Sequence, residues 1–136
     1  SGSMLSTIEI GDRIVASRLA YITNDPQRYD IVIFKYPDDE KQYYVKRIIG
    51  LPGDTIRVEK GTVIRNGEPV DEPYLTHKAS YSTEEITLGE GEYYVLGDNR
   101  PISHDSHSSD VGPVTEIVGK VRCVIWPLSR IGTTLD

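Results

Sequence analysis

Turn residues divide this chain into segments too short for ordinary helices, and this division constrains the fold more than any other feature. Glycine occurs 12 times and proline 8 times among 136 residues, and nine of the eleven aromatic residues are tyrosines. The runs between the turns are rich in valine, isoleucine and tyrosine, which favour strands. No window of a dozen residues repeats its apolar positions with the 3.6-residue period of a helix. We therefore predict an all-β domain, a folded-over sheet or partly open barrel with a small β-hairpin excursion.

The turn signals divide the chain into predicted strands. A pair of short strands is predicted within residues 54–70, with reversals at Lys60-Gly61 and Asn66-Gly67, because Asn-Gly is the strongest short hairpin signal. A single helical turn is expected in 113–119, and the polar stretch 71–90 is expected to form a flexible excursion. The other predicted strands cover residues 13–21, 29–36, 42–50, 92–97 and 119–128. No linker or internal repeat is visible, so residues 1–136 are predicted to form a single domain.

Composition excludes several classes of function. The formal net charge is −6, which argues against binding to nucleic acid because no basic patch outweighs the carboxylates. A lone cysteine, Cys123, excludes an internal disulfide and any metal site built from several cysteines. No run approaches the 18 or so apolar residues that a membrane span needs.

A lysine stands in the middle of an apolar strand, and this is the most unusual local feature. In QYYVKRIIG (42–50), side chains alternate between the faces of the strand, so Lys46 shares its face with Tyr44 and Ile48. Its ammonium group either reaches water along the surface or is held inside, where burial lowers the pKa and the neutral amine can accept a proton. The stretch alone does not decide between these two outcomes.

A second concentration of polar residues lies in the loop GDNRPISHDSHSSD (97–110). His104 and His107 with nearby aspartates could bind a metal ion, although such a sequence is also typical of a solvated turn. A Ser-His-Asp triad is a further alternative, but no Gly-x-Ser-x-Gly elbow marks a nucleophile. A third alternative pairs a serine with Lys46, because a desolvated lysine can act as the base that a serine nucleophile needs.

Three stretches resemble the conserved boxes of the bacterial type I signal peptidases, in the family's order and with a middle region most similar to Gram-positive members. They are SGSMLSTIEIGDR (1–13), YDIVIFKYPDDEKQYYVKRIIGLPGD (29–54) and GDNRPISHDS (97–106). In addition, KGTVIRNGEPVDEPY (60–74) resembles the family's connecting hairpin. The resemblance covers the chain nearly end to end. It implies a serine endopeptidase domain that cuts signal peptides from exported preproteins after small residues, typically Ala-x-Ala.

The resemblance also implies a role for each matching residue. Ser3 would be the nucleophile and Lys46 its general base, with Ser103 orienting the lysine. The Ser1 hydroxyl and the Ser3 backbone N–H would stabilise the oxyanion. The shallow substrate pockets would be formed by Met4, Ile8, Tyr44 and Val45, and the structural loop by Gly97, Asp98, Asn99, Arg100 and Asp105. A bound substrate would add as a strand beside the nucleophile and lysine segments.

Partners and location follow from the same resemblance. The partners expected are preprotein signal peptides and the plasma membrane, through an anchor outside this chain, with the catalytic domain on the extracytoplasmic face. No cofactor, metal or nucleic acid is expected, and the domain is expected to be a monomer.

The chain departs from the family pattern at a few positions. Ser6 stands where many members have proline, and Pro101-Ile102 stands where Asp-Asn is frequent. His107 replaces the arginine that commonly pairs with the loop aspartate, so the partner of Asp105 is left open. Two other interpretations remain. A non-cleaving assembly factor of the same fold would bind pilin or secreted substrates but would lack the serine or the lysine. A self-cleaving repressor would need a DNA-binding segment, which this acidic chain does not show.

Overall fold

The computed structural model describes residues 2–9, 12–36, 39–126, 130, 132 and 135, and these residues form an all-β fold. A short 3-10 turn, η1 (Leu19–Tyr21), follows the first strand. The strands are β1 (Arg13–Ser17), β2 (Ile31–Tyr36), β3 (Asp39–Gly50), β4 (Thr55–Glu59), β5 (Thr62–Arg65), β6 (Glu68–Pro69), β7 (Ile86–Thr87), β8 (Tyr94–Leu96) and β9 (Ile117–Trp126). The predicted all-β class is therefore confirmed.

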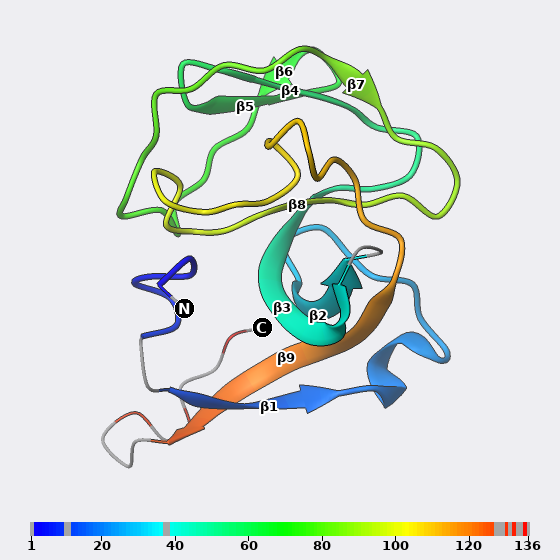
Figure 1. Ribbon diagram of the computed structural model, residues 1–136, viewed down its shortest axis with the longest axis vertical. Helices are drawn as coiled ribbons and strands as arrows, with labels where there is room; N and C mark the ends of the chain where they lie inside the picture. Colours follow the sequence, from blue (N-terminus) through cyan, green and yellow to red (C-terminus); the bar gives the residue numbers. More distant parts are fainter. Residues whose placement is uncertain are drawn as a thin grey trace.

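The larger sheet has the strand order β1-β9-β2-β3-β8 and is antiparallel throughout (Figure 1). Its middle strands β2 and β3 contribute side chains to cores on both faces, which explains their nearly continuous apolar runs. Ile31 and Ile33 of β2 pack in one cluster, whereas Val32 and Phe34 pack in another on the opposite face. Alternating residues of one strand thus contribute to two different cores.

The smaller sheet has the order β6-β5-β4-β7 and lies above the larger one in Figure 1. Its two tight reversals fall where the sequence predicts them. Lys60 and Gly61 have φ angles of 47° and 85°, and Asn66 and Gly67 have φ angles of 52° and 83°. Two successive positive φ angles are characteristic of the type I′ turn, whose twist suits a hairpin. The expected hairpin is therefore present, within a sheet of four strands.

A single apolar cluster joins the two sheets. The larger sheet contributes Ile49, Tyr94 and Leu96, and the smaller sheet with the residue that follows β7 contributes Ile56, Val58, Val63 and Leu88. Each of these side chains is at most 2% exposed. The chain passes from one sheet to the other at the end of β3, so this cluster lies directly beyond the strand that carries Lys46.

Two local predictions differ from the structure. The helical turn expected in 113–119 is wrong, because Val114 forms an isolated antiparallel bridge with Tyr93 and β9 begins at Ile117. The strand expected over 13–21 ends at Ser17 and gives way to η1. In both places pairing with a distant segment, which a local pattern does not contain, decides the conformation. Residues 71–85 form no strand, and β7 follows them.

Candidate active site

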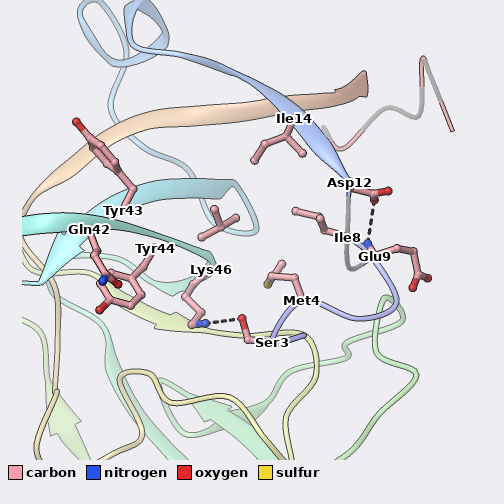
Figure 2. Close-up of a pocket in the computed structure, with 11 residues that line it drawn as sticks. Ser3, Met4, Ile8, Glu9, Asp12, Ile14, Gln42, Tyr43, Tyr44 and Lys46 are labelled. Atoms are coloured by element: carbon pink, nitrogen blue, oxygen red, sulfur yellow. Dashed lines mark hydrogen bonds between the residues drawn. The ribbon is translucent and has the colours of Figure 1, made fainter. Parts of the chain in front are cut away.

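Ser3 and Lys46, which are 43 residues apart in the sequence, meet in the structure. Lys46 Nζ donates a hydrogen bond to Ser3 Oγ at 2.6 Å (Figure 2). Ser3 is 8% exposed and Lys46 is 5% exposed. The lysine therefore takes the second of the two outcomes considered for it, and its amine is held inside the protein beside a hydroxyl group.

The position of Lys46 in the sheet explains its burial. Val32 of β2 lies opposite Lys46 in the register, and Ile48 lies on the same face of β3. Burial among these side chains lowers the pKa of Lys46, and the nearby carboxylate of Asp105 partly opposes this by raising it. Removal of water disfavours the charged ammonium. A neutral amine at this distance can accept the proton of the Ser3 hydroxyl.

The loop that follows β8 holds the Ser3 segment in place through its backbone. The Asn99 N–H donates to the Ser3 carbonyl at 2.7 Å, and the Asn99 side-chain amide donates to the Gly2 carbonyl at 2.9 Å. The Thr7 hydroxyl donates to the Asp98 carboxylate. Residues 98–99 thus fix both sides of the proposed nucleophile.

Asp98 also connects the loop to the strand of the lysine. Its two carboxylate oxygens accept hydrogen bonds from Arg47 Nε and Nη2 at 2.9 and 2.7 Å, and the Arg47 guanidinium lies 4.0 Å from the centre of the Tyr74 ring. Paired, planar contacts of this kind set orientation as well as distance. Asp98 therefore links three parts of the site: the Ser3 segment, β3 and its own loop.

Gly97 allows the loop and the Ser3 segment to approach closely. A Cβ atom at this position would lie 2.2 Å from Ser103 Oγ and 2.6 Å from the Ser3 carbonyl oxygen. Both separations are far below van der Waals contact, so any side chain would force the segments apart. Gly97 is one of the residues expected to form the structural loop, and this close approach explains why a glycine is needed there.

Ser103 lies near the pair, but the hydrogen bond to Lys46 that was expected of it is not formed. Its side chain is 5% exposed, and its hydroxyl is one of the buried polar groups without a hydrogen-bond partner in the described part of the chain. A buried hydroxyl with no partner is unfavourable by about 1–3 kcal/mol. The orienting role of Ser103 stays a prediction.

Two further residues of the loop are braced by buried contacts. Arg100, 2% exposed, forms a paired interaction with Glu72, and its Nε donates to the Gly97 carbonyl at 2.9 Å. Asp105 is fully buried and accepts a hydrogen bond from the Gly97 N–H at 2.8 Å. Its other oxygen contacts the His107 ring at Nδ1. His107 is therefore the partner of Asp105 that the sequence left open.

The histidines of the loop form two separate pairs. His107 bonds to Asp105 and stacks on Tyr81 with ring centres 3.9 Å apart, whereas His104 contacts Asp110 at the surface at 3.1 Å. Among the residues that the structure describes, no three His, Cys, Asp or Glu side chains are close enough to hold a metal ion. The loop therefore offers no geometric support for the metal alternative.

A groove of about 350 Å³ begins at the pair and follows β3 (Figure 2). Its walls include all four residues expected to form substrate pockets, Met4, Ile8, Tyr44 and Val45. They also include residues that the sequence analysis did not identify, namely Glu9, Asp12, Ile14, Gln42 and Tyr43. Side chains alternate between the faces of β3 and β1. This alternation would have indicated Tyr43 and Ile14 as groove residues if the sequence had also shown which edge of β3 has no neighbouring strand.

The groove runs along an edge of β3 that has no neighbouring strand in the described residues. The Ile48 N–H and C=O both form hydrogen bonds with residues 29 and 30, on the β2 side of β3. Backbone groups of alternate residues point to opposite edges of a strand, so the N–H and C=O groups of Val45 and Tyr43 point to the other edge. On that edge β8 pairs only with Arg47, Ile48 and Gly50. The backbone of Val45 and Tyr43 is therefore positioned to pair with an added strand.

Ser1 lies outside the described residues, so the oxyanion role expected of it stays a prediction, as does that of the Ser3 N–H. No helix in the described ranges has the length and apolar character needed to span a bilayer.

Comparison with known proteins agrees with the geometry. The family model described as "Signal peptidase, peptidase S26" matches residues 1–126. The chain is 38% identical over 141 residues to the probable signal peptidase I-2 of Synechocystis sp., which covers 100% of this chain and 65% of that protein. It is 36% identical over 142 residues to the signal peptidase I of Bacillus caldolyticus, covering 94% of this chain and 77% of that protein.

A solved structure is also similar. The crystal structure of a signal peptidase I from Enterococcus faecalis matches with a TM-score of 0.57 and 34% identity, covering 71% of this chain and 96% of that one. The similar proteins thus include both cyanobacterial and Gram-positive ones. The chain spans about two thirds of the length of the cyanobacterial relatives.

Proposed function

Because this chain belongs to the signal peptidase family, peptidase S26, a family of serine endopeptidases, we propose that it cleaves signal peptides from preproteins after small residues. The observation that carries the proposal is the contact of 2.6 Å between Ser3 Oγ and the amine of the buried Lys46. Two chemically complementary groups, distant in the sequence, are held together at the end of a groove that can accept an extended peptide.

The proposed reaction uses the two groups in turn. Lys46, in its neutral form, accepts the hydroxyl proton as Ser3 Oγ attacks the scissile carbonyl carbon. The lysine then gives this proton to the amine nitrogen as the peptide bond breaks, leaving an ester on Ser3. A water molecule, deprotonated by the same amine, attacks the ester and restores both groups. Ser103 would orient the lysine, and the Ser1 hydroxyl and the Ser3 N–H would donate to the oxyanion.

The groove supports the preference for small residues. The substrate would pair with the open edge of β3, and its side chains would alternate between the apolar wall at Met4, Ile8 and Val45 and the opposite side. Shallow pockets beside Ser3 suit alanine better than larger side chains. The full protein would be anchored in the plasma membrane, with this domain on the extracytoplasmic face.

Cleavage of a fluorogenic peptide that contains Ala-x-Ala, with detergent or lipid present, tests the proposal. Ser3→Ala and Lys46→Ala should each lower kcat by about a thousandfold or more, since the two groups act as a unit. Ser6→Ala and Lys78→Ala, which change the same residue types outside the groove, should retain the parent rate. Mass spectrometry should place the cut after the second alanine.

A parent protein that binds the peptide but leaves it intact, with a folded circular dichroism spectrum, would contradict the proposal. The result would instead favour the non-cleaving assembly factor. Cleavage that persists in both Ser3→Ala and Lys46→Ala would assign the chemistry to other residues.

A further inference from the structure

A second, smaller hollow continues from the far end of the groove. It measures about 220 Å³ and is lined by Ala16, Arg18, Ile33, Tyr43, Val118 and Gly119. Tyr43 lines both this hollow and the groove, and Ile33 belongs to the same apolar cluster as four residues of the groove wall, Met4, Ile8, Ile14 and Val45. The two depressions therefore lie on one continuous face of the larger sheet.

The walls of the two depressions follow the same two strands. On β3 the wall passes from Val45 to Tyr43, and on β1 it passes from Ile14 to Ala16, in each case a step of two residues that stays on one face. Figure 2 shows Tyr43 on the side of β3 away from Tyr44 and Gln42. The small Ala16 side chain leaves part of the space between these walls unfilled. At Gly119 the β1 backbone approaches closely, because a Cβ there would lie 2.8 Å from the Ser17 carbonyl oxygen.

The alternation of a bound strand determines which substrate residue reaches the hollow. β8 occupies the edge of β3 beyond Lys46, so a strand beside Ser3 can extend only toward Tyr43. If the alanines one and three residues before the cut face the apolar wall, the residue five before the cut faces it too. The fifth residue before the cut is four strand residues, about 13 Å, from the one that borders the cut, whereas Tyr43 is three residues, about 10 Å, from Lys46. The fifth residue therefore lies at the level of Tyr43 or past it.

Two cations contact Tyr43, which lines the hollow. Arg18 Nη2 donates to the Tyr43 hydroxyl at 3.5 Å, and Lys35 Nζ lies 4.8 Å from the centre of the Tyr43 ring. These contacts hold Tyr43 in position even though it is 52% exposed. An apolar floor with cations nearby is complementary to an aliphatic side chain and unfavourable for a basic one.

We propose that this hollow is a binding subsite for an aliphatic side chain five residues before the scissile bond. It would recognise the end of the apolar segment of a signal peptide, upstream of the small residues that border the cut. The inference deepens the proposed function and rests on it for the direction in which the substrate lies.

Peptide binding to the Ser3→Ala protein tests the subsite without cleavage. Three peptides that share Ala-x-Ala carry leucine, alanine or lysine at the fifth position before the cut, and fluorescence anisotropy gives Kd for each. Leucine should bind about fivefold more tightly than alanine, because the shallow hollow buries only part of the side chain. Lysine should bind most weakly.

Filling the hollow provides the matched comparison. In the Ser3→Ala background, Ala16→Leu should reduce the ratio of Kd for alanine to Kd for leucine to about one. Val15→Leu, an aliphatic change of the neighbouring residue on the outer face of β1, should retain the ratio. Thermal unfolding of each variant reports whether the fold is intact. Equal Kd values for the leucine and alanine peptides, or a ratio unaffected by Ala16→Leu, would overturn the subsite.

The two proposals can fail separately. Cleavage of all three peptides by the parent at equal kcat/KM would keep the peptidase function and remove the subsite. In the opposite outcome, the parent prefers the leucine peptide in binding, loses this preference in Ala16→Leu, and cleaves none of the peptides. That result would support the subsite and contradict the peptidase function.

Discussion

At the scale of single residues, the charge state of Lys46 connects stability with the proposed chemistry. Its pKa is lowered by burial, so over the interval between the lowered value and the ordinary 10.5 the unfolded chain holds a proton that the folded chain has released. Wherever the unfolded state binds more protons, the free energy of unfolding rises with pH. Lys46 therefore makes folding less favourable at neutral pH than at high pH.

Lys46→Met should remove this dependence. The variant should be more stable than the parent at pH 7, by about 1.4 kcal/mol for each unit by which the lysine pKa is lowered. The difference should disappear as the pH approaches 10.5. Urea unfolding at a series of pH values measures it, with the exposed Lys78→Met as control. The parent's cleavage rate should rise with pH to a midpoint below 10.5, and a midpoint at 10.5 would contradict the lowered pKa.

At the scale of elements, the loop after β8 holds the Ser3 segment in place. Asn99 donates to the carbonyl oxygens of Gly2 and Ser3, which flank the Ser3 side chain, and Gly97 leaves no room between Ser103 and the Ser3 carbonyl. The distance between Ser3 and Lys46 is therefore set by a third segment that need not touch the substrate.

Gly97→Ala should lower kcat by about a hundredfold, because its Cβ would displace the Ser3 carbonyl or the Ser103 side chain. Overpacking of this kind should also reduce the free energy of unfolding by about 1–3 kcal/mol. Gly89→Ala is the matched control, since its added Cβ would meet only the flexible Glu92 side chain. Peptide cleavage and urea unfolding give the two quantities. Unchanged kcat in Gly97→Ala would show that the loop after β8 does not position Ser3.

The sequence predicted this part of the molecule unevenly. Its pattern of short β-rich runs predicted the strands, and Asn66-Gly67 predicted its hairpin, because both depend on local conformation. The meeting of Ser3 with Lys46 followed only from resemblance, since no local pattern relates residues 43 positions apart. The partner of Asp105, the open edge of β3 and the bridge at Val114 all depend on which distant segments lie adjacent, so the sequence did not predict them.

At the scale of the whole molecule, the two sheets share one core. The apolar cluster that joins the sheets takes side chains from both, and its member Leu88 is 2% exposed. Neither sheet can lose its contacts there without exposing the apolar surface of the other. We therefore expect the described fold to unfold as one cooperative unit.

Leu88→Ala should lower the free energy of unfolding by about 2–5 kcal/mol, the usual range for a buried leucine. Far-UV and near-UV circular dichroism should shift to lower urea by the same amount and still coincide. Leu19→Ala, at a leucine that is 74% exposed, should change stability by less than about 0.5 kcal/mol. Separate transitions for the two signals would show that the sheets unfold independently.

The half-open edge of β3 has one more consequence. An unpaired edge normally invites another sheet to dock beside it, yet here it lies inside a groove bounded by β1 and the Ser3 segment (Figure 2). A lone extended chain can enter such a space, whereas the border strand of a folded domain brings its neighbours with it and is too thick. We therefore expect the groove to bind extended, unfolded polypeptide and to exclude both folded domains and other copies of this protein.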